Sequence, residues 1–522
     1  MGGNSRFDIV IVGSGLGGSA AARILAEGGL SVLVVERGDY VRQERANWDV
    51  AEVSLRRRYD SGETWYDADG KPFTPRTYYN VGGATKFFGG AALRFRARDF
   101  ESRELEDGPS VAWPYGYDEL APWYDRAEAL LEVHGRLGED PTEPPRGPYP
   151  FPPLEHEERI AELSSRFADQ GLHPFHLPLA IDQGGKGRCV KGSPCDGFPC
   201  MVRAKGDAEN RLLRPLLLRG LPNLELMTGS RALRFETGAD GKRVEALVLE
   251  KEGKIEKVAA DRFILSAGAV NSALLLLASA NDRHPRGLGN SSDLVGRNFM
   301  CHENTVIMAL SPFRENPTVF QKTLAVHDFY GAGDLPGPAL GAIQMRGKVK
   351  PEMLKAKRGF LFRRFSGAIA ARSLDFWLMT EDLAEKGNRV WLDEAGRVRL
   401  SRRVTNVRTR EALISRTKTM LRQAGLPIIL VERRGIETLQ HQCGTLRFGV
   451  DPATSVLDPW GKTHELDNLY AIDASFMPSS AAVNPSLTLL AQSLRAAARL
   501  REELGAGQAF PEGATAPGAA GA

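Results

Sequence analysis

The N-terminal strand–helix–strand unit restricts the fold more than any other part of the chain. An apolar run over 8–12 predicts a β-strand, and Gly13, Gly15 and Gly18 then open an Ala-rich helix in a Gly-x-Gly-x-x-Gly pattern. The first glycine of this pattern allows a tight turn, the second lets a pyrophosphate approach the backbone, and the third lets the helix pack on the strand. A second apolar strand ends at Glu36, which can accept hydrogen bonds from a ribose diol. The unit therefore predicts a dinucleotide site, with the phosphates at the helix N-terminus.

Length and composition indicate a globular protein. With 522 residues the chain can form more than one domain, and we expect two interleaved ones. Its 68 Lys and Arg residues against 65 Asp and Glu residues leave a net charge of +3, too balanced to predict binding to nucleic acid or to an anionic membrane. The sequence contains no uninterrupted apolar run of about 18 residues, so we expect no membrane-spanning helix. The first strand begins so early that we expect no signal peptide before it. Five cysteines do not form a disulfide framework, so we expect a cytoplasmic protein.

The pattern along the chain predicts an α/β fold with a second, largely antiparallel sheet. After an extended excursion over 40–75 comes a segment that we name the glycine loop, residues 82–90. Its glycine density together with two phenylalanines indicates backbone pressed against a flat partner rather than a flexible linker. The antiparallel sheet is expected over 305–410, where 367–381 and 387–400 alternate in polarity. The other expected elements are helices over 117–134, 208–218, 272–278 and 410–424, strands over 224–235 and 262–266, and a hairpin over 244–259 that turns at residues 252–253.

Residues suited to catalysis gather near the C-terminus. His441 precedes a Cys-Gly-Thr sequence, and a later strand leads to Asp473 and Ala474. An apolar helix then follows Asn484 and Pro485. Asn is favoured as an N-cap and Pro as the first helical residue, so we expect Asn484 to cap this helix.

Five motifs occur in an order that resembles the glucose–methanol–choline (GMC) family of FAD-dependent alcohol oxidoreductases. They are the glycine fingerprint, GGATKFFGG of the glycine loop, ILSAGAVNSALLLLAS at 264–279, HQCGT at 441–445 and NPSLTLLAQSLRAA at 484–497. The resemblance spans nearly the whole chain, although 300–430 matches the family only in pattern. It implies a Rossmann-type FAD-binding domain with a parallel sheet, interleaved with a substrate domain built on a largely antiparallel sheet flanked by helices.

The resemblance implies where these domains lie. The FAD-binding domain is expected to be discontinuous, and the substrate-binding domain and its excursions to fill the intervals, with a disordered tail at the end. The expected segments are 1–100, 200–305 and 435–508 for the FAD-binding domain, 101–199 and 306–434 for the substrate-binding part, and 509–522 for the tail.

The resemblance also implies two catalytic residues. His441 corresponds to the family's active-site histidine and would take the hydroxyl proton while a hydride passes from the carbinol carbon to flavin N5, a task that suits a neutral imidazole. Asn484 corresponds to its partner position and would donate to the oxygen as alkoxide character develops. The Asn-Pro form is similar to the branch that contains choline, cholesterol and pyranose oxidases. His302 and His464 are expected to be surface or structural histidines.

Further residues are implied to contact FAD. Beyond the fingerprint and Glu36, they are Gly83, Thr85, Ala232, Asp473, Ala474 and Pro485. Ala232 is expected near the adenine, and Asp473 and Ala474 near the pyrophosphate and the ribityl chain. The glycine loop would run past the reactive edge of the flavin. Some relatives link FAD covalently through a histidine in this loop, and because none is present here we expect non-covalent FAD.

Three clustered cysteines, Cys189, Cys195 and Cys200, are not explained by the resemblance. Most zinc and iron–sulfur sites need four soft ligands, and the spacing here matches no standard motif. Cys301 or Cys443 could supply a fourth, but Cys443 adjoins the predicted catalytic histidine. We therefore expect no metal site and interpret residues 189–200, the cysteine loop, as a buried structural loop with reduced or partly disulfide-bonded thiols.

The sequence thus predicts a flavoprotein that oxidises an alcohol to a carbonyl compound. The substrate is expected to be a small molecule, favouring a sugar, glycoside, aminosugar or cyclitol, with oxygen or another compound as the electron acceptor. The alternatives are an FAD-containing non-redox lyase, an oxidase of a sterol or another hydrophobic alcohol, and an FAD subunit that passes electrons to a partner. Neither the choice between oxidase and dehydrogenase nor homo-oligomerisation is decided by the sequence.

Overall fold

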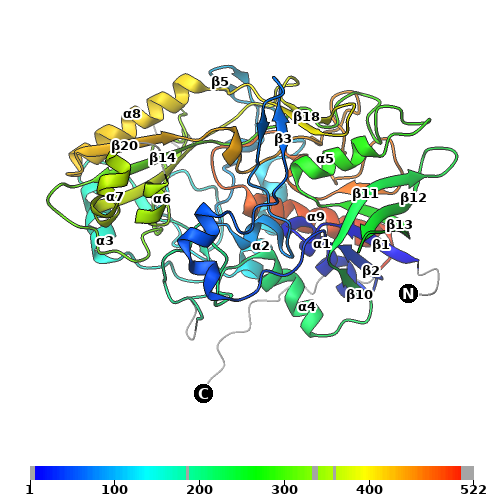
Figure 1. Ribbon diagram of the computed structural model, residues 1–522, viewed down its shortest axis with the longest axis horizontal. Coiled ribbons are helices and arrows are strands. Elements are labelled where there is room, and N and C mark those ends of the chain that lie inside the picture. Colours follow the sequence, from blue (N-terminus) through cyan, green and yellow to red (C-terminus); the bar gives the residue numbers. More distant parts are fainter. Residues whose placement is uncertain (1–5, 184–186, 332–338, 357–359, 507–522) are drawn as a thin grey trace.

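A seven-stranded sheet carries the glycine fingerprint (Figure 1). The computed structural model describes residues 6–183, 187–331, 339–356 and 360–506, so the tail predicted over 509–522 lies outside the described residues. The strands of this sheet are β1 (Phe7–Val12), β2 (Val32–Val35), β10 (Leu224–Met227), β11 (Ser230–Thr237), β12 (Val244–Lys251), β13 (Lys254–Leu265) and β21 (Leu469–Ala471). Strands β10, β2, β1, β13 and β21 are parallel, as the fingerprint predicts, and β12 and β11 extend the sheet in antiparallel order.

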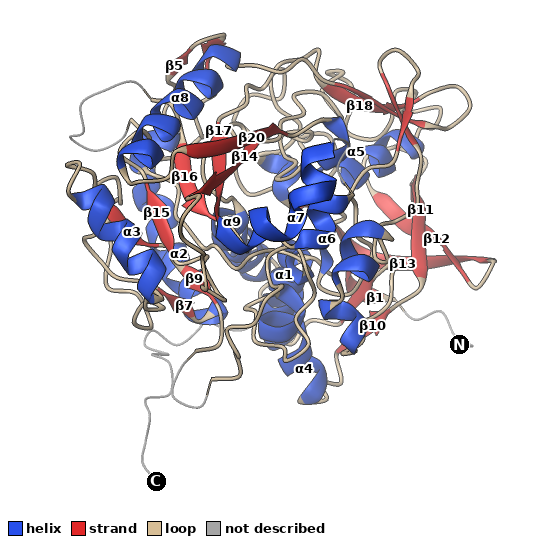
Figure 2. Ribbon diagram, turned by 60° about the vertical axis from the view of Figure 1, so that its left-hand side comes forward, coloured by secondary structure: helices blue, strands red, loops and turns tan. Residues whose placement is uncertain are grey.

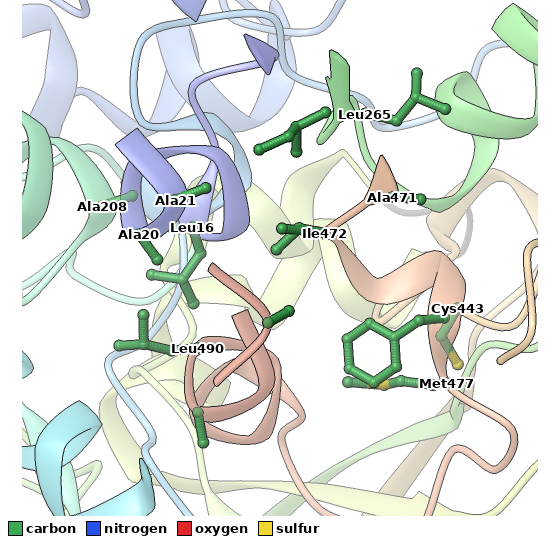
Figure 3. Close-up of a cluster of buried hydrophobic side chains, with 14 of the residues drawn as sticks. Leu16, Ala20, Ala21, Ala208, Leu265, Cys443, Ala471, Ile472, Met477 and Leu490 are labelled. Atoms are coloured by element: carbon green, nitrogen blue, oxygen red, sulfur yellow. The ribbon is translucent and has the colours of Figure 1, made fainter. Parts of the chain in front are cut away.

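Two long helices cover the parallel strands. They are α1 (Leu16–Glu27) and α9 (Ser486–Glu503), and α2 (Tyr117–Leu131) packs on α9. Figure 3 shows Leu16 and Ala20 of α1 close to Leu490 of α9, with Ile472 beside them, and all four are buried. Small alanine side chains let the helices approach closely, so the first helix of the fingerprint and the last helix of the chain form one core.

A second sheet of six antiparallel strands forms the other side of the molecule (Figures 1 and 2). In spatial order its strands are β20 (Ile428–Arg433), β14 (Glu303–Leu310), β17 (Ser373–Thr380), β16 (Ala342–Met345), β15 (Leu324–Val326) and β8 (Pro174–His176). One face packs on α3 (Glu158–Ala168) and α8 (Val407–Gln423), and the other on α6 (Pro351–Lys355) and α7 (Phe360–Arg372). Ile307 faces the first pair of helices while Val306 and Met308 face the second, as the period of two in a strand requires.

Shorter elements connect these layers. The strands are β3 (Trp65–Asp67), β4 (Pro72–Phe73), β5 (Glu104–Leu105), β6 (Gly108–Pro109), β7 (Val133–His134), β9 (Leu179–Ala180), β18 (Arg389–Leu392) and β19 (Val398–Ser401). The helices are η1 (Arg45–Trp48), η2 (Ala51–Leu55), η3 (Gly83–Lys86), η4 (Ala97–Phe100), η5 (Glu209–Leu213), α4 (Arg214–Leu218), α5 (Ala269–Ala278), η6 (Ile436–Thr438) and η7 (Ala474–Phe476). Within the described part of the chain, no helix has the length and apolar character needed to cross a membrane.

Several predicted elements are wrong in detail. The strand predicted over 224–235 is two strands, because Gly229 has a φ of +62° and turns the chain from β10 to β11. The strand predicted over 262–266 is the end of the long strand β13. The first half of 367–381 is helical, since its small residues also suit α7. The hairpin of β18 and β19 joins β3 and β4 in a separate four-stranded sheet instead of the antiparallel sheet.

Candidate active site

The glycine fingerprint forms the turn between β1 and α1. Gly13 has a φ of +102°, and a Cβ atom there would lie 2.3 Å from the carbonyl oxygen of Ser266. A Cβ atom at Gly18 would lie 2.0 Å from the carbonyl oxygen of Gly13. Gly15 differs, because the nearest described atom to its Cβ position is the Ser266 oxygen, at 4.0 Å. Gly13 and Gly18 therefore serve the packing of the protein itself, whereas Gly15 leaves open space at the start of α1.

Glu36 is buried at the carboxyl end of β2, beside this turn. One carboxylate oxygen accepts hydrogen bonds from the backbone N–H of Ser14 at 3.0 Å and from its hydroxyl at 2.6 Å, and the other accepts from the N–H of Gly38 at 2.9 Å. The carbonyl oxygen of Glu36 accepts from the N–H of Ser230 at 2.9 Å. This bond brings the start of β11, the strand that carries Ala232, to the same edge of the sheet.

The glycine loop packs directly on the fingerprint. A Cβ atom at Gly83 would lie 3.0 Å from the Cα of Gly15, so the two backbones are in close contact. The Thr85 hydroxyl donates to the carbonyl oxygen of Gly82 at 2.7 Å and accepts from the N–H of Ala208 at 3.1 Å. These contacts explain the glycines at the start of the loop, because the backbone there approaches the open space beside Gly15.

Asp473 is a buried carboxylate between β21 and η7. Its Oδ2 accepts from the N–H of Gly268 at 3.0 Å and from the hydroxyl of Ser272 at 2.5 Å, and its Oδ1 accepts from the N–H of Ser475 at 2.9 Å. Burial raises the pKa of Asp473, and these hydrogen bonds oppose the rise. The carboxylate thus joins the ends of β13 and β21 next to the fingerprint, where Gly17 packs against the Ile472 carbonyl oxygen.

His441 meets a second histidine that is distant in the sequence. It lies in a bend with a φ of +59°, just before Gly444, whose N–H donates to the carbonyl oxygen of Ala474 at 3.3 Å. The Nδ1 atoms of His441 and His302 are 2.8 Å apart, and the Nε2 of the buried His302 lies 3.0 Å from the carbonyl oxygen of Ser480. His302 is therefore buried, so the interpretation of it as a surface residue is wrong.

The hydrogen bonds assign the tautomers of this pair. A carbonyl oxygen only accepts, so the Nε2 of His302 carries a proton toward Ser480, and in the neutral ring its Nδ1 is an acceptor. The Nδ1 of His441 must then donate, which leaves the Nε2 of His441 unprotonated. Burial lowers the pKa of His441 well below its ordinary value, and the neighbouring His302 and Lys322 add to the effect. Burial also lowers the pKa of His302. Both rings are thus neutral near pH 7.

Asn484 lies just before α9, in the segment that also carries Ser480. The helix begins at Ser486 with Pro485 as the N-cap residue, and no side chain caps it. The prediction that Asn484 caps the helix is therefore wrong, because the helix begins one residue later than expected. Its Oδ1 is buried and has no hydrogen-bond partner among the described residues.

Comparison with known proteins identifies the family. A GMC oxidoreductase N-terminal model matches residues 178–304, the C-terminal model matches 392–493, and an FAD binding domain model matches 8–48. The chain is 33% identical to paromamine 6'-oxidase of Streptomyces fradiae over 95% of this chain and 92% of that protein. It is 32% identical to 6'''-hydroxyparomomycin C oxidase of Streptomyces lividus, over 96% and 93%.

The chain belongs to the GMC oxidoreductase family. It is accordingly an FAD-dependent alcohol oxidoreductase, as its motifs predict. Among solved structures, pyridoxine 4-oxidase from "Mesorbium loti" has the same fold, with a TM-score of 0.69 and 20% identity over 95% of this chain and 99% of that one. The prediction of a Rossmann-type domain combined with an antiparallel sheet is confirmed.

The residues of this GMC oxidoreductase fit FAD. The space beside Gly15 is bounded by the start of α1 and the glycine loop, and Glu36 lies at the carboxyl end of the neighbouring strand. This combination of open backbone, helix N-terminus and acidic residue is the one that a dinucleotide needs. The glycine loop contains no histidine, which is consistent with non-covalent binding.

The cysteine loop of the GMC oxidoreductase holds free thiols. All five cysteines are free in the structure, and the described residues contain no group of three or more His, Cys, Asp or Glu side chains placed to hold a metal ion. Burial raises the pKa of Cys189 and of Cys195, so both are thiols rather than thiolates at neutral pH.

The contact between His302 and His441 could not be found from the sequence. His302 lies immediately before β14 and contacts His441. Lys322, just before β15, lowers the pKa of His441, and Asp196 of the cysteine loop raises it. No short-range pattern links positions so far apart in the chain. The only signal was a histidine at 302 beside an apparent turn, which by itself is more typical of a surface or structural residue.

Proposed function

We propose that this GMC oxidoreductase oxidises a CH–OH group of a sugar or aminosugar to a carbonyl group. Two relatives above 30% identity, matched over nearly their whole length, are named as a paromamine 6'-oxidase and a 6'''-hydroxyparomomycin C oxidase. Fructose dehydrogenase large subunit of Gluconobacter japonicus is a more distant relative, at 26% identity over 95% of this chain and 98% of that protein. The substrate class is therefore inferred from the names of these three relatives, two of which are above 30% identity.

His441 is the proposed general base, and its hydrogen bond to His302 carries the proposal. The Nε2 of His441 carries no proton, so its lone pair can accept one. The lowered pKa of His441 keeps this nitrogen unprotonated near pH 7. As this nitrogen takes the hydroxyl proton, the ring becomes cationic, and its Nδ1–H bond to His302 becomes charge-assisted and stronger. The second histidine thus stabilises the protonated state that forms during the reaction.

Asn484 is the proposed second contact to the substrate oxygen. Its amide would donate an N–H to the oxygen that loses its proton, so that the developing negative charge is stabilised. When bound, FAD supplies the two-electron acceptor of the reaction. The residues proposed to hold it are Gly13, Gly15, Gly18, Glu36, Gly83, Thr85, Ala232, Asp473, Ala474 and Pro485.

The two sheets support a division of the chain into an FAD-binding domain and a substrate-binding part. We place the FAD-binding domain in 1–100, 200–305 and 435–508, because these segments contribute the parallel strands, α1 and α9. The substrate-binding part is 101–199 and 306–434, which supplies most of the antiparallel sheet. His302 lies at the junction, immediately before β14.

The test is reduction of the bound flavin by alcohols without oxygen. The purified protein would be mixed anaerobically with a panel of sugars, aminosugars, cyclitols and a sterol, and bleaching of the flavin absorbance followed. Bleaching by a sugar or aminosugar supports the proposal, whereas bleaching only by the sterol, or by no alcohol, contradicts it. Recolouring in air would indicate an oxidase, and recolouring only with a quinone or dye would indicate a dehydrogenase.

A further inference from the structure

Asp382 is a buried aspartate that meets the residue just before His302. Strands β14 and β17 pair in antiparallel order (Figure 2), and Glu303 lies opposite Thr380 at the end of the ladder. Two residues beyond that end, the same register brings Cys301 opposite Asp382. There the Oδ2 of Asp382 accepts a hydrogen bond from the backbone N–H of Cys301 at 3.1 Å. The aspartate side chain thus holds the backbone that leads directly into His302.

The main chain of Asp382 holds the segment that supplies the acceptor for His302. Its N–H donates to the hydroxyl oxygen of Ser480 at 3.0 Å, and the same hydroxyl lies 3.2 Å from the carbonyl oxygen of Asp382, to which it can donate. The carbonyl oxygen of Ser480 in turn accepts from the Nε2–H of His302. One residue therefore fixes both the backbone beside the imidazole and the carbonyl group to which the imidazole bonds.

Arg402 binds Asp382 and the segment around His302 together. Its guanidinium group donates to the Oδ2 of Asp382 at 3.1 Å and to the carbonyl oxygen of Cys301 at 3.3 Å. It also forms an ion pair with the carboxylate of Glu303. The side chains of Arg402, Asp382 and Glu303 are only 7%, 0% and 4% exposed. Buried charges must stay paired and hydrogen-bonded, so these contacts restrict how residues 301–303 can move.

The placement of His302 decides which nitrogen of His441 is free. While the Nε2 of His302 donates to Ser480, its Nδ1 accepts from His441, and the Nε2 of His441 carries no proton. If the Ser480 carbonyl group moved away, His302 could carry its proton on Nδ1 instead and donate to His441. The Nε2 of His441 would then be protonated, and it could not take a proton from the substrate.

We infer that Asp382 is a positioning residue, which fixes His302 on the carbonyl group of Ser480. The proton-free Nε2 of His441 depends on this placement, although the described hydrogen bonds of Asp382 go to other residues. Arg402 contributes by holding the carboxylate of Asp382 in place. The inference rests on the proposed function, since the placement affects the reaction only if His441 takes the substrate proton.

The test is a double-mutant cycle in the flavin-containing enzyme, with anaerobic flavin reduction by the best sugar of the panel as the readout. Asp382→Asn keeps the size of the side chain and leaves Arg402 paired with Glu303, so the protein should fold. We expect the rate at saturating sugar to fall about 10-fold or more, the scale of a lost hydrogen bond to a charged group, while KM changes less than about threefold. In a His302→Leu background the same substitution should cost less than about threefold, because the group that it positions is gone.

Glu128→Gln is the matched control. Glu128 is as buried as Asp382 and is paired with Arg94 and Arg146, and none of its described hydrogen bonds reaches the segments around the two histidines. The control should leave the rate unchanged at equal FAD content. If Asp382→Asn does not fold, Ser480→Ala takes its place in the cycle. It removes the hydroxyl that bonds to Asp382 and keeps the carbonyl group, so it should give a smaller loss that again disappears without His302.

A second measurement does not depend on the substrate. The nitrogen NMR spectrum of histidine-labelled protein distinguishes protonated from unprotonated ring nitrogens, and replacing His302 and His441 in turn assigns their signals. We expect protons on the Nε2 of His302 and the Nδ1 of His441 in the wild type, and a mixture with the opposite tautomers in Asp382→Asn.

The outcomes separate the inference from the proposed function. An unchanged rate in Asp382→Asn, an equal loss with and without His302, or unchanged tautomers would overturn the inference, and reduction of the flavin by a sugar would leave the proposed function standing. If no sugar reduces the flavin, the proposed function falls, and the tautomers alone decide whether Asp382 positions the histidine pair.

Discussion

Replacing His302 tests whether this residue sets the chemistry of His441. In the structure the Nδ1 of His302 accepts from His441 and its Nε2 donates to Ser480. His302→Asn keeps an acceptor near the Nδ1 position, His302→Gln keeps a donor near the Nε2 position, and His302→Leu removes both. If the bond to His441 matters, the Asn variant should retain more activity than the Gln variant, although all three lose the imidazole.

The size of the effect follows from the bond that strengthens in the reaction. A hydrogen bond that involves a charged group contributes about 1.5–3 kcal/mol, and about 1.4 kcal/mol corresponds to a tenfold change in rate. His302→Leu should therefore slow flavin reduction about 10- to 150-fold. Substrate affinity should change little, since His302 bonds to His441 and Ser480 rather than facing the substrate.

The assay is stopped-flow reduction of the flavin under anaerobic conditions at saturating sugar. His464→Asn is the matched control, because His464 bonds to Ser455 away from the site and should leave the rate unchanged. Equal FAD content and melting temperature would show that the variants are folded. A rate for His302→Leu within about twofold of the wild type, or a Gln variant faster than the Asn variant, would refute the assignment.

The remaining predictions concern the base, the amide and the cofactor. Since the pKa of His441 is lowered, the reduction rate should stay constant as pH falls to about 6.5, the ordinary histidine value, and decline only below it; an apparent pKa above 7 in the pH–rate profile would contradict this. Asn484→Asp should fold normally, as no helix cap is lost, yet reduce flavin far more slowly than Asn484→His, because it adds a negative charge where an alkoxide develops; equal rates would remove Asn484 from the mechanism. Gly15→Val should give folded protein without FAD, measured by absorbance and circular dichroism, whereas Gly18→Ala should lower the melting temperature itself, since its Cβ would meet backbone at 2.0 Å. FAD should be released intact by acid, and flavin that stays on the denatured chain would show a covalent link.

Much of the architecture follows from local patterns in the sequence. The fingerprint predicts a strand, a turn and a helix because only glycine tolerates the φ of Gly13 and the contact at Gly18. The hairpin over 244–259 and the helix over 410–424 appear nearly as predicted, as β12 with the start of β13 and as α8. The failures occur where one pattern suits two structures, as in the first half of 367–381, whose small residues form part of α7.

In the candidate site, too, the sequence predicts some features and fails to predict others. The fingerprint and the glycine loop could be selected from the sequence, because close backbone approach demands glycine at particular positions and the motifs are continuous. Asp473 was implied only by the resemblance to the family. The start of α9 was misplaced by one residue, since Asn and Pro are both suitable near a helix N-terminus and only the fold shows which of them precedes the first turn.

The sequence by itself determined which residue types are proposed to carry the chemistry: the glycines that open space for a dinucleotide, one histidine shortly before Gly-Thr and one Asn-Pro. Only the tertiary structure decided what those residues touch. His302 meets His441 from 139 positions away, and Lys322 meets Asp196 across 126. Such pairs depend on how two sheets pack, which the hydrophobic period of each strand does not encode. The tautomer of the proposed base arises from such a long-range contact.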